Sequence, residues 1–270
     1  MEEAVKSTLE QTILANLTLD GKLLDLEDKN IGPEEMRLLC DAEDLSSVEQ
    51  LYLSQNQLCG ESIEILGEVK GLTGLTSLYL NHNIIGDEET KVLANAELLK
   101  NLKCLMLEAN NIGPQGAETL ACSPNLKKLE ILFLDSNPIG PEGAMSVAHS
   151  GGLPSLQALH LDSTGIGDDG VRAIAESPHF KDLKKLYLCS NKMGNAGAIA
   201  LAKSESLRNL IILSIWRNEI RDKGGQAIAE SQTFMNLERL YMSLNLIERP
   251  VRKIIRGSEL AKRLTTLVMD

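Results

Sequence analysis

Apolar and polar positions recur along this chain with a period of 27 residues. One leucine of the repeat returns ten times in register, at Leu24, Leu51, Leu78, Leu105, Leu132, Leu159, Leu186, Leu213, Leu240 and Leu267. Five positions later most copies carry asparagine, at Asn56, Asn83, Asn110, Asn137, Asn191, Asn218 and Asn245, with Lys29 and Thr164 as the exceptions. A fixed period of this length indicates stacked copies of one structural unit.

Residues 129–155 illustrate the unit. Leu132 and Leu134 flank Phe133, and this alternation of period two predicts a short strand with both leucines pointing inward. Ala144, Val147 and Ala148 follow at helical spacing and predict a helix that packs on the strands. Each copy is therefore expected to fold as a strand, a turn and a helix.

The turn between strand and helix carries side chains that can bond backbone groups. The asparagine amides are expected to form a ladder from copy to copy, which weakens at Thr164. At the start of several helices an oxygen-bearing side chain is expected to cap the helix. These residues are Asp87, Asp168, Asn195 and Asp222.

The motif L-x-x-L-x-L-x-x-N at this period predicts an α/β leucine-rich-repeat solenoid, a horseshoe with a concave parallel sheet and convex helices. We expect one solenoid domain with an N-terminal capping helix in residues 1–20. Nine repeats follow in residues 21–247, and residues 248–270 form a C-terminal capping helix and terminal strand. Val5, Leu9 and Ile13 lie on one side of the first helix. Arg252 and Arg256, at positions that hold small residues in earlier repeats, suit a terminal repeat.

The longer pattern N-x-I-G-x-x-G-A-x-x-L-A, seen in residues 110–121 and, with Met193 in place of isoleucine, in residues 191–202, is similar to the ribonuclease-inhibitor-like subclass of leucine-rich repeats. Ran GTPase-activating protein and the recognition domains of innate immune receptors share this subclass. The resemblance covers about residues 21–270 and implies a fold that hosts many binding tasks. This chain departs from the ribonuclease inhibitor in its uniform repeat length and few cysteines. The residues with which the ribonuclease inhibitor and the Ran activator contact their partners cannot be matched onto positions of this chain.

Charge and composition narrow the partners. Residues 1–202 hold 15 Lys and Arg against 30 Asp and Glu, and residues 203–270 hold 12 against 8. An acidic chain disfavours nucleic acid and favours a protein partner with basic surface, although acidity also serves solubility. No apolar run is long enough for a membrane span. Five scattered cysteines indicate reduced thiols in the cytoplasm, and the sequence does not tell whether the chain is an effector injected into a host cell.

Two sets of equivalent positions are predicted to face the concave side. The first concave column, between the inward strand residues, is Asp25, Tyr52, Tyr79, Met106, Phe133, His160, Tyr187, Ser214, Tyr241 and Val268. The second concave column, two residues further on, is Glu27, Ser54, Asn81, Glu108, Asp135, Asp162, Cys189, Trp216, Ser243 and Asp270. From these columns we predict a partner-binding strip of Tyr52, Tyr79, Glu108, Phe133, Asp135, His160, Asp162, Tyr187, Trp216 and Tyr241.

A structural interpretation competes with this one, because tyrosine favours strands and neighbouring rings can stack. Only Tyr52 and Tyr79 are consecutive tyrosines, so stacking is expected to explain little of the strip. Glu108, Asp135 and Asp162 would suit a Lys or Arg of the partner, or form a solvated edge. Lys185, Arg217 and Arg239 give the C-terminal part the opposite sign.

Catalytic motifs are absent from the sequence. The four histidines have no metal-ligand spacing, and neither a phosphate-binding loop nor a G-x-S-x-G segment occurs. Cys104 and Cys189 lack a neighbouring histidine on the next strand. We expect no enzyme, metal or cofactor, but a monomeric binding module that acts as scaffold, inhibitor or effector. A GTPase-activating protein resembling the Ran activator, and self-association through the tenth strand, are the alternatives.

Overall fold

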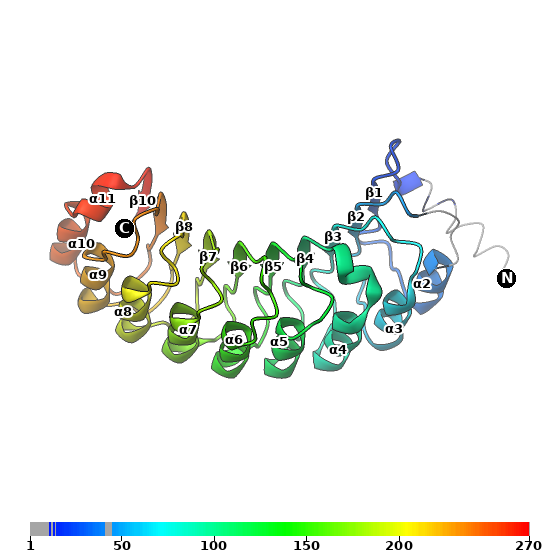
Figure 1. Ribbon diagram of the computed structural model, residues 1–270, viewed down its shortest axis with the longest axis horizontal. Helices are drawn as coiled ribbons and strands as arrows, with labels where there is room; N and C mark the ends of the chain where they lie inside the picture. The colour runs from blue at the N-terminus through cyan, green and yellow to red at the C-terminus, as the bar shows by residue number, and fades with distance from the viewer. Residues whose placement is uncertain (1–10, 12, 14, 41–44, 270) are drawn as a thin grey trace.

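The computed structural model describes residues 11, 13, 15–40 and 45–269, and this part of the chain forms one curved array of strands and helices (Figure 1). Ten parallel strands of the described residues lie in a single sheet in chain order. They are β1 (Leu23–Asp25), β2 (Gln50–Tyr52), β3 (Ser77–Tyr79), β4 (Cys104–Met106), β5 (Ile131–Phe133), β6 (Ala158–His160), β7 (Lys185–Tyr187), β8 (Ile212–Ser214), β9 (Arg239–Tyr241) and β10 (Thr266–Val268). The sheet lines the concave side of the arc.

Helices cover the convex side, one after each of the first nine strands (Figure 1). They are α2 (Pro33–Cys40), α3 (Gly60–Glu68), α4 (Asp87–Asn95), α5 (Pro114–Ala121), α6 (Gly140–His149), α7 (Gly167–Glu176), α8 (Asn195–Lys203), α9 (Asp222–Ala229) and α10 (Arg249–Arg256). The short helices η1 (Glu97–Asn101) and α11 (Glu259–Arg263) lead into strands β4 and β10. Because a helix is wider than a strand, this arrangement curves the stack.

Strand register follows the 27-residue period without a shift. Leu24 pairs with Leu51, and Leu51 pairs with Leu78. These leucines have no exposed surface, and Phe180 and Phe234, which follow helices α7 and α9, are also buried. The α/β solenoid predicted from the sequence is therefore confirmed, and its core is one continuous apolar layer between sheet and helices.

The asparagine ladder forms as predicted. The Asn110 side chain accepts a hydrogen bond from the Ile85 amide at 3.0 Å and donates to the carbonyls of Leu80 and Leu107, each at 3.0 Å. Each asparagine therefore ties its own turn to the preceding repeat.

Thr164 interrupts the side-chain ladder toward the preceding repeat and keeps its link to the next one. Its hydroxyl donates to the Leu161 carbonyl at 2.6 Å and lies 3.0 Å from Asn191 Oδ1. It offers no second donor to the preceding repeat. The Ile139 amide, which an asparagine here would bond, instead donates to the Asn137 carbonyl within its own turn. The local turn therefore changes shape to suit the threonine.

The helix caps differ from the prediction. We expected Asp87 and its equivalents to cap the helices that they begin. Instead, Asp87 Oδ1 accepts the amides of Gly113 and Gly116 at the start of α5, one repeat further on, at 2.7 and 2.8 Å. Asp168 does the same for Gly194 and Gly197. The carboxylate lies between neighbouring helices, so it accepts hydrogen bonds from the N–H groups that are free at the start of the next helix. These bonds link the two repeats.

Most of the predicted N-terminal capping helix lies outside the described residues, Val5 and Leu9 included. Gln11, Ile13, Ala15 and Asn16 are helical, and the Ile13 side chain is buried. At the other end the Arg256 guanidinium donates to the Met269 carbonyl, which joins α10 to the last strand. No helix among the described residues has the length and apolar character that a membrane crossing requires.

Candidate partner-binding face

The first concave column is a row of half-buried rings on the sheet. Each ring extends from a strand position whose two neighbours point into the core, and these neighbours are leucines except for Met242 beside Tyr241, so the ring projects toward the concave side. The half-buried members are Tyr52, Tyr79, Phe133, His160, Tyr187 and Tyr241. All six belong to the predicted partner-binding strip, and neighbouring positions of the row lie about 4.8 Å apart.

Stacking is more extensive than the sequence suggested. Tyr52 and Tyr79 stack with ring centroids 3.9 Å apart. His160 lies between Phe133 and Tyr187, with centroid distances of 3.7 and 4.0 Å. The expectation that only the tyrosine pair would stack was wrong, because the imidazole of His160 also has a flat face. Five of the strip's rings thus support one another and are held rigid.

The acidic members of the second concave column also have a structural role. Asp135 Oδ1 accepts the Asp162 amide at 2.6 Å, and Asp162 Oδ1 accepts the Cys189 amide at 2.6 Å. Asn81 Oδ1 accepts the Glu108 amide in the same way, at 2.9 Å. Asn81, Asp135 and Asp162 therefore each link their own repeat to the next one. Side-chain oxygens recurring at 27-residue spacing were the sequence signal for these links.

Burial changes the charge of this acidic group. It raises the pKa of the Asp135 carboxyl from 3.8 to about 7, to which the nearby charges of Asp162 and Glu108 add. Burial also raises the pKa of Asp162. Near neutral pH the group therefore carries less negative charge than its composition indicates. A cation from a partner would favour the ionised form of Asp135.

His160 is neutral in this setting. Burial, with the charge of Lys185, lowers the pKa of its imidazole from 6.5 to about 4. Its Nδ1 lies 3.9 Å from Asp135 Oδ2, but between about pH 4 and 7 neither group is predominantly charged. The pair is therefore a polar contact of two neutral groups and not an ion pair in this range.

The C-terminal part of the concave face has a different character. Trp216 is the most exposed ring of the strip, with 37% of its surface accessible. Ser214, between the positions of Tyr187 and Tyr241, is buried and bonds the Cys189 thiol at 3.1 Å. Lys185 and Arg239 are exposed at the starts of β7 and β9. Here the surface is apolar and cationic.

The concave thiols are suited to packing. Burial raises the pKa of Cys104 to about 11 and that of Cys189 to about 12, so both are protonated at neutral pH. A thiol in this state is a poor nucleophile. Among the described residues no group of His, Cys, Asp and Glu side chains could hold a metal ion.

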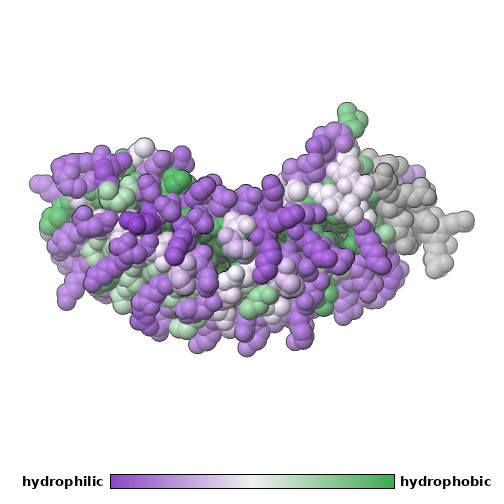
Figure 2. Space-filling model, viewed as in Figure 1, coloured by the Kyte–Doolittle hydropathy of each residue, from purple (hydrophilic) through white to green (hydrophobic). Residues whose placement is uncertain are grey.

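Sequence reasoning missed two exposed apolar residues. Leu244 and Leu246, in the turn after β9, have 59% and 47% of their surface accessible. The molecule is otherwise mainly hydrophilic on the face seen in Figure 2, with small apolar patches. The signal was present in the sequence, because most equivalent turn positions in other repeats are polar or small.

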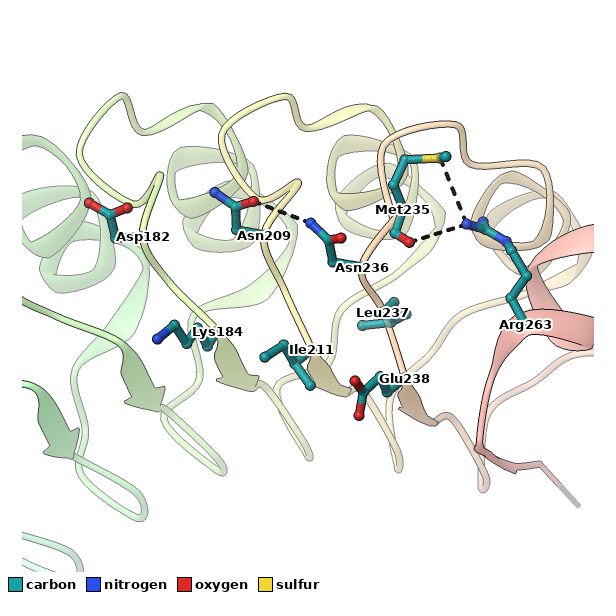
Figure 3. A pocket seen from close by; sticks show the side chains of 9 residues that line it. All are labelled: Asp182, Lys184, Asn209, Ile211, Met235, Asn236, Leu237, Glu238 and Arg263. Carbon is teal, nitrogen blue, oxygen red and sulfur yellow. Dashed lines mark hydrogen bonds between the residues drawn. The ribbon is translucent and has the colours of Figure 1, made fainter.

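A shallow pocket lies at the opposite edge of the sheet, where loops enter β7 to β9 (Figure 3). It contains none of the predicted strip residues. Asn236 donates to Asn209 Oδ1 at 3.3 Å across it, and Arg263 donates to the Met235 carbonyl at 3.2 Å. Since these polar groups bond one another and link consecutive repeats, the pocket is part of the solenoid's framework.

A family model described as Leucine Rich repeat matches five segments of the chain, residues 99–121, 125–148, 152–175, 181–202 and 206–229. Comparison with curated protein sequences gives no match. The five matched segments fall on consecutive repeats of the ten-stranded sheet and its helices. The chain is an α/β leucine-rich-repeat solenoid.

Proposed function

We propose that this protein is a protein-interaction module that binds its partner on the concave face. Leucine-rich repeats commonly act in this way, because stacking creates an extended concave surface. The observation that carries the proposal is the stack of Phe133, His160 and Tyr187, which is rigid and half exposed at the middle of the arc. Rings that are already immobilised lose little conformational freedom on binding.

The partner chemistry that this site favours is a protein segment with apolar side chains and at least one Lys or Arg. The apolar groups would contact the ring edges. The cation would approach Asp135 and Glu108, favour ionisation of Asp135 and release its proton. The affinity for the partner would therefore rise as the pH rises through 7, and this pH dependence is a specific expectation of the proposal.

The experiment compares proteins captured by the wild-type chain and by the double variant Phe133→Ala, Tyr187→Ala. Circular dichroism first establishes that the double variant is folded. Arg172→Ala on the convex helix α7, at an exposed position, is the matched control. We expect a protein captured by wild type and control to be missing from the double variant. Capture of the same proteins by all three would contradict the proposal.

The likeness to the ribonuclease-inhibitor-like subclass supports a role as scaffold, inhibitor or effector in the cytoplasm. It also supports a second candidate, a GTPase-activating protein resembling the Ran activator. The observation in its favour is Arg217, exposed in the turn after β8, where an arginine could reach a bound nucleotide. Single-turnover GTP hydrolysis by small GTPases, measured with and without the chain, tests this candidate, and Arg217→Ala is the control variant. If the wild-type chain does not raise the hydrolysis rate, the candidate is excluded.

A further inference from the structure

The turns after β8 and β9 differ from the turns of most other repeats because they carry exposed apolar side chains. Trp216, Leu244 and Leu246 have 37%, 59% and 47% of their surface accessible. In the described repeats, Ile84 is the only other non-proline apolar residue exposed at the position equivalent to Leu246. Three departures in two consecutive repeats concentrate apolar surface at one edge of the concave face.

Leu244 is held in a backbone conformation that does not suit it. Its φ is +52°, in the left-handed region, where a branched side chain meets the backbone. The equivalent residues of the other repeats share this conformation and are Asp28, Gln55, His82, Ala109, Ser136, Ser163, Ser190 and Arg217. An exposed leucine here does not stabilise the fold through burial, so a contact outside the chain is the better explanation.

Two cations lie beside Leu244 on this surface. Lys192 and Arg217 are exposed and, among the described residues, form no ion pair. Together with Leu244 they line a shallow groove, which also contains Glu219 and the hydroxyl-bearing Ser190. Glu219 is the one anion of the groove, so two cations face one carboxylate. The charge balance favours an anionic occupant.

We propose that the C-terminal rim, formed by Lys192, Trp216, Arg217, Leu244 and Leu246, is a docking surface for an acidic segment of a partner protein that also carries apolar side chains. The apolar side chains contact Trp216 and Leu244, and flanking carboxylates pair with Lys192 and Arg217. The rim spans three consecutive repeats, about 10 Å across the strands, which suits a short segment.

This inference goes beyond the proposed concave-face function. The rim is centred on the turns after β7 to β9, and its chemistry is opposite to that of the acidic group beside the ring stack. A partner could use both surfaces, but neither requires the other.

The test selects peptides from a phage-displayed library of random 12-residue sequences on the wild-type chain. Selected peptides are then measured by fluorescence polarisation against Leu244→Asn and Arg217→Glu. We expect selected peptides rich in Asp and Glu with Leu, Phe or Trp. We expect each variant to weaken their binding at least tenfold and added salt to weaken it further.

Matched controls separate binding from folding. Ile84→Asn removes an exposed apolar residue at the position equivalent to Leu246, and Arg172→Glu reverses an exposed charge on the convex side. Both should bind as wild type does. Asparagine suits the left-handed region, so Leu244→Asn should unfold at a temperature no lower than wild type. Loss of binding by a variant of equal or greater stability cannot come from misfolding.

Three outcomes would overturn the proposal. The first is no enrichment, or enrichment of peptides without acidic residues. The second is peptides whose binding is lost in Phe133→Ala but kept in Leu244→Asn, since they occupy the concave face of the proposed function. The third is a dimer of the wild-type chain in light scattering that Leu244→Asn abolishes, because a second copy would then be the occupant.

Discussion

The buried pair Asp135 and His160 makes opposite contributions to stability as the pH changes. The folded chain holds the Asp135 proton up to about pH 7, whereas the unfolded chain loses it near 3.8. The contribution of Asp135 to stability is therefore present below pH 3.8 and lost as the pH rises through 7. A pKa rise of this size corresponds to about 4 kcal/mol.

His160 acts in the other direction. The unfolded chain binds its proton near pH 6.5, but the folded chain binds it only near pH 4. Stability is therefore lost as the pH falls from 6.5 to 4, by about 3 kcal/mol. Between about pH 4 and pH 6.5 the two effects nearly cancel, so the stability of the wild-type chain shows little of either one. A variant that removes one group exposes the other.

Asp135→Asn is the informative change. Asn81 occupies the equivalent position two repeats earlier, and its amide oxygen accepts the next repeat's N–H at 2.9 Å. The substituted amide can therefore keep the bond to the Asp162 amide. We expect the stability of the variant relative to wild type to rise between pH 4 and pH 8 by up to about 4 kcal/mol.

Urea unfolding followed by far-ultraviolet circular dichroism, at intervals from pH 4 to pH 8, measures this difference. The transition must be single, because long repeat arrays can unfold in steps. Asp182→Asn, at an exposed position, gives the baseline for losing a carboxylate. His160→Gln should give the opposite slope between pH 4 and 6.5. A pH-independent difference for Asp135→Asn would refute the reasoning.

Four further substitutions test the framework by the same unfolding measurement. Asn110→Ala should lower the free energy of unfolding by about 3 kcal/mol, since it leaves the Ile85 amide without its acceptor. Thr164→Ala should lower it by only about 1 kcal/mol, because the Leu161 carbonyl keeps its bond from Asn191. Equal losses in the two variants would contradict this. Gly152→Ala should cost more than about 3 kcal/mol, because its Cβ would lie 1.8 Å from the Ala121 carbonyl oxygen; a variant as stable as wild type would show that this contact relaxes. Leu244→Asn should stabilise the fold by about 0.5–1 kcal/mol by relieving the left-handed backbone, and a loss of stability would mean that Leu244 packs on the chain.

The fold could be predicted because each repeat has the same pattern of apolar and polar positions. Leu24, Leu51 and the other leucines of that position mark the strands, and the period alone fixes the register that the sheet adopts. What the pattern did not reveal was the direction of individual bonds. Asp87 was expected to cap α4 and instead caps α5, because sequence spacing within a repeat does not say which neighbour is nearer.

The candidate site was predicted only in part. The columns of residues came from the period, but the stack around His160 depends on ring orientation, which spacing does not give. Likewise the acidic residues Asp135 and Asp162 were interpreted as partner contacts. Their oxygens accept N–H groups of the next repeat and their charge is reduced by burial, and neither effect can be derived from residue type alone.

In a solenoid whose copies share one framework, residues that leave the framework are the best guide to function. Along the second concave column, Asn81, Asp135 and Asp162 each supply an oxygen to the following repeat. Cys189 and Trp216 have no side-chain oxygen, so they cannot form this bond. The exposed apolar residues Trp216, Leu244 and Leu246 lie in this part of the arc, beside the exposed cations Lys192 and Arg217. Because nothing in the repeat requires this change, we propose the C-terminal repeats as the part of the chain on which partner recognition acts most directly.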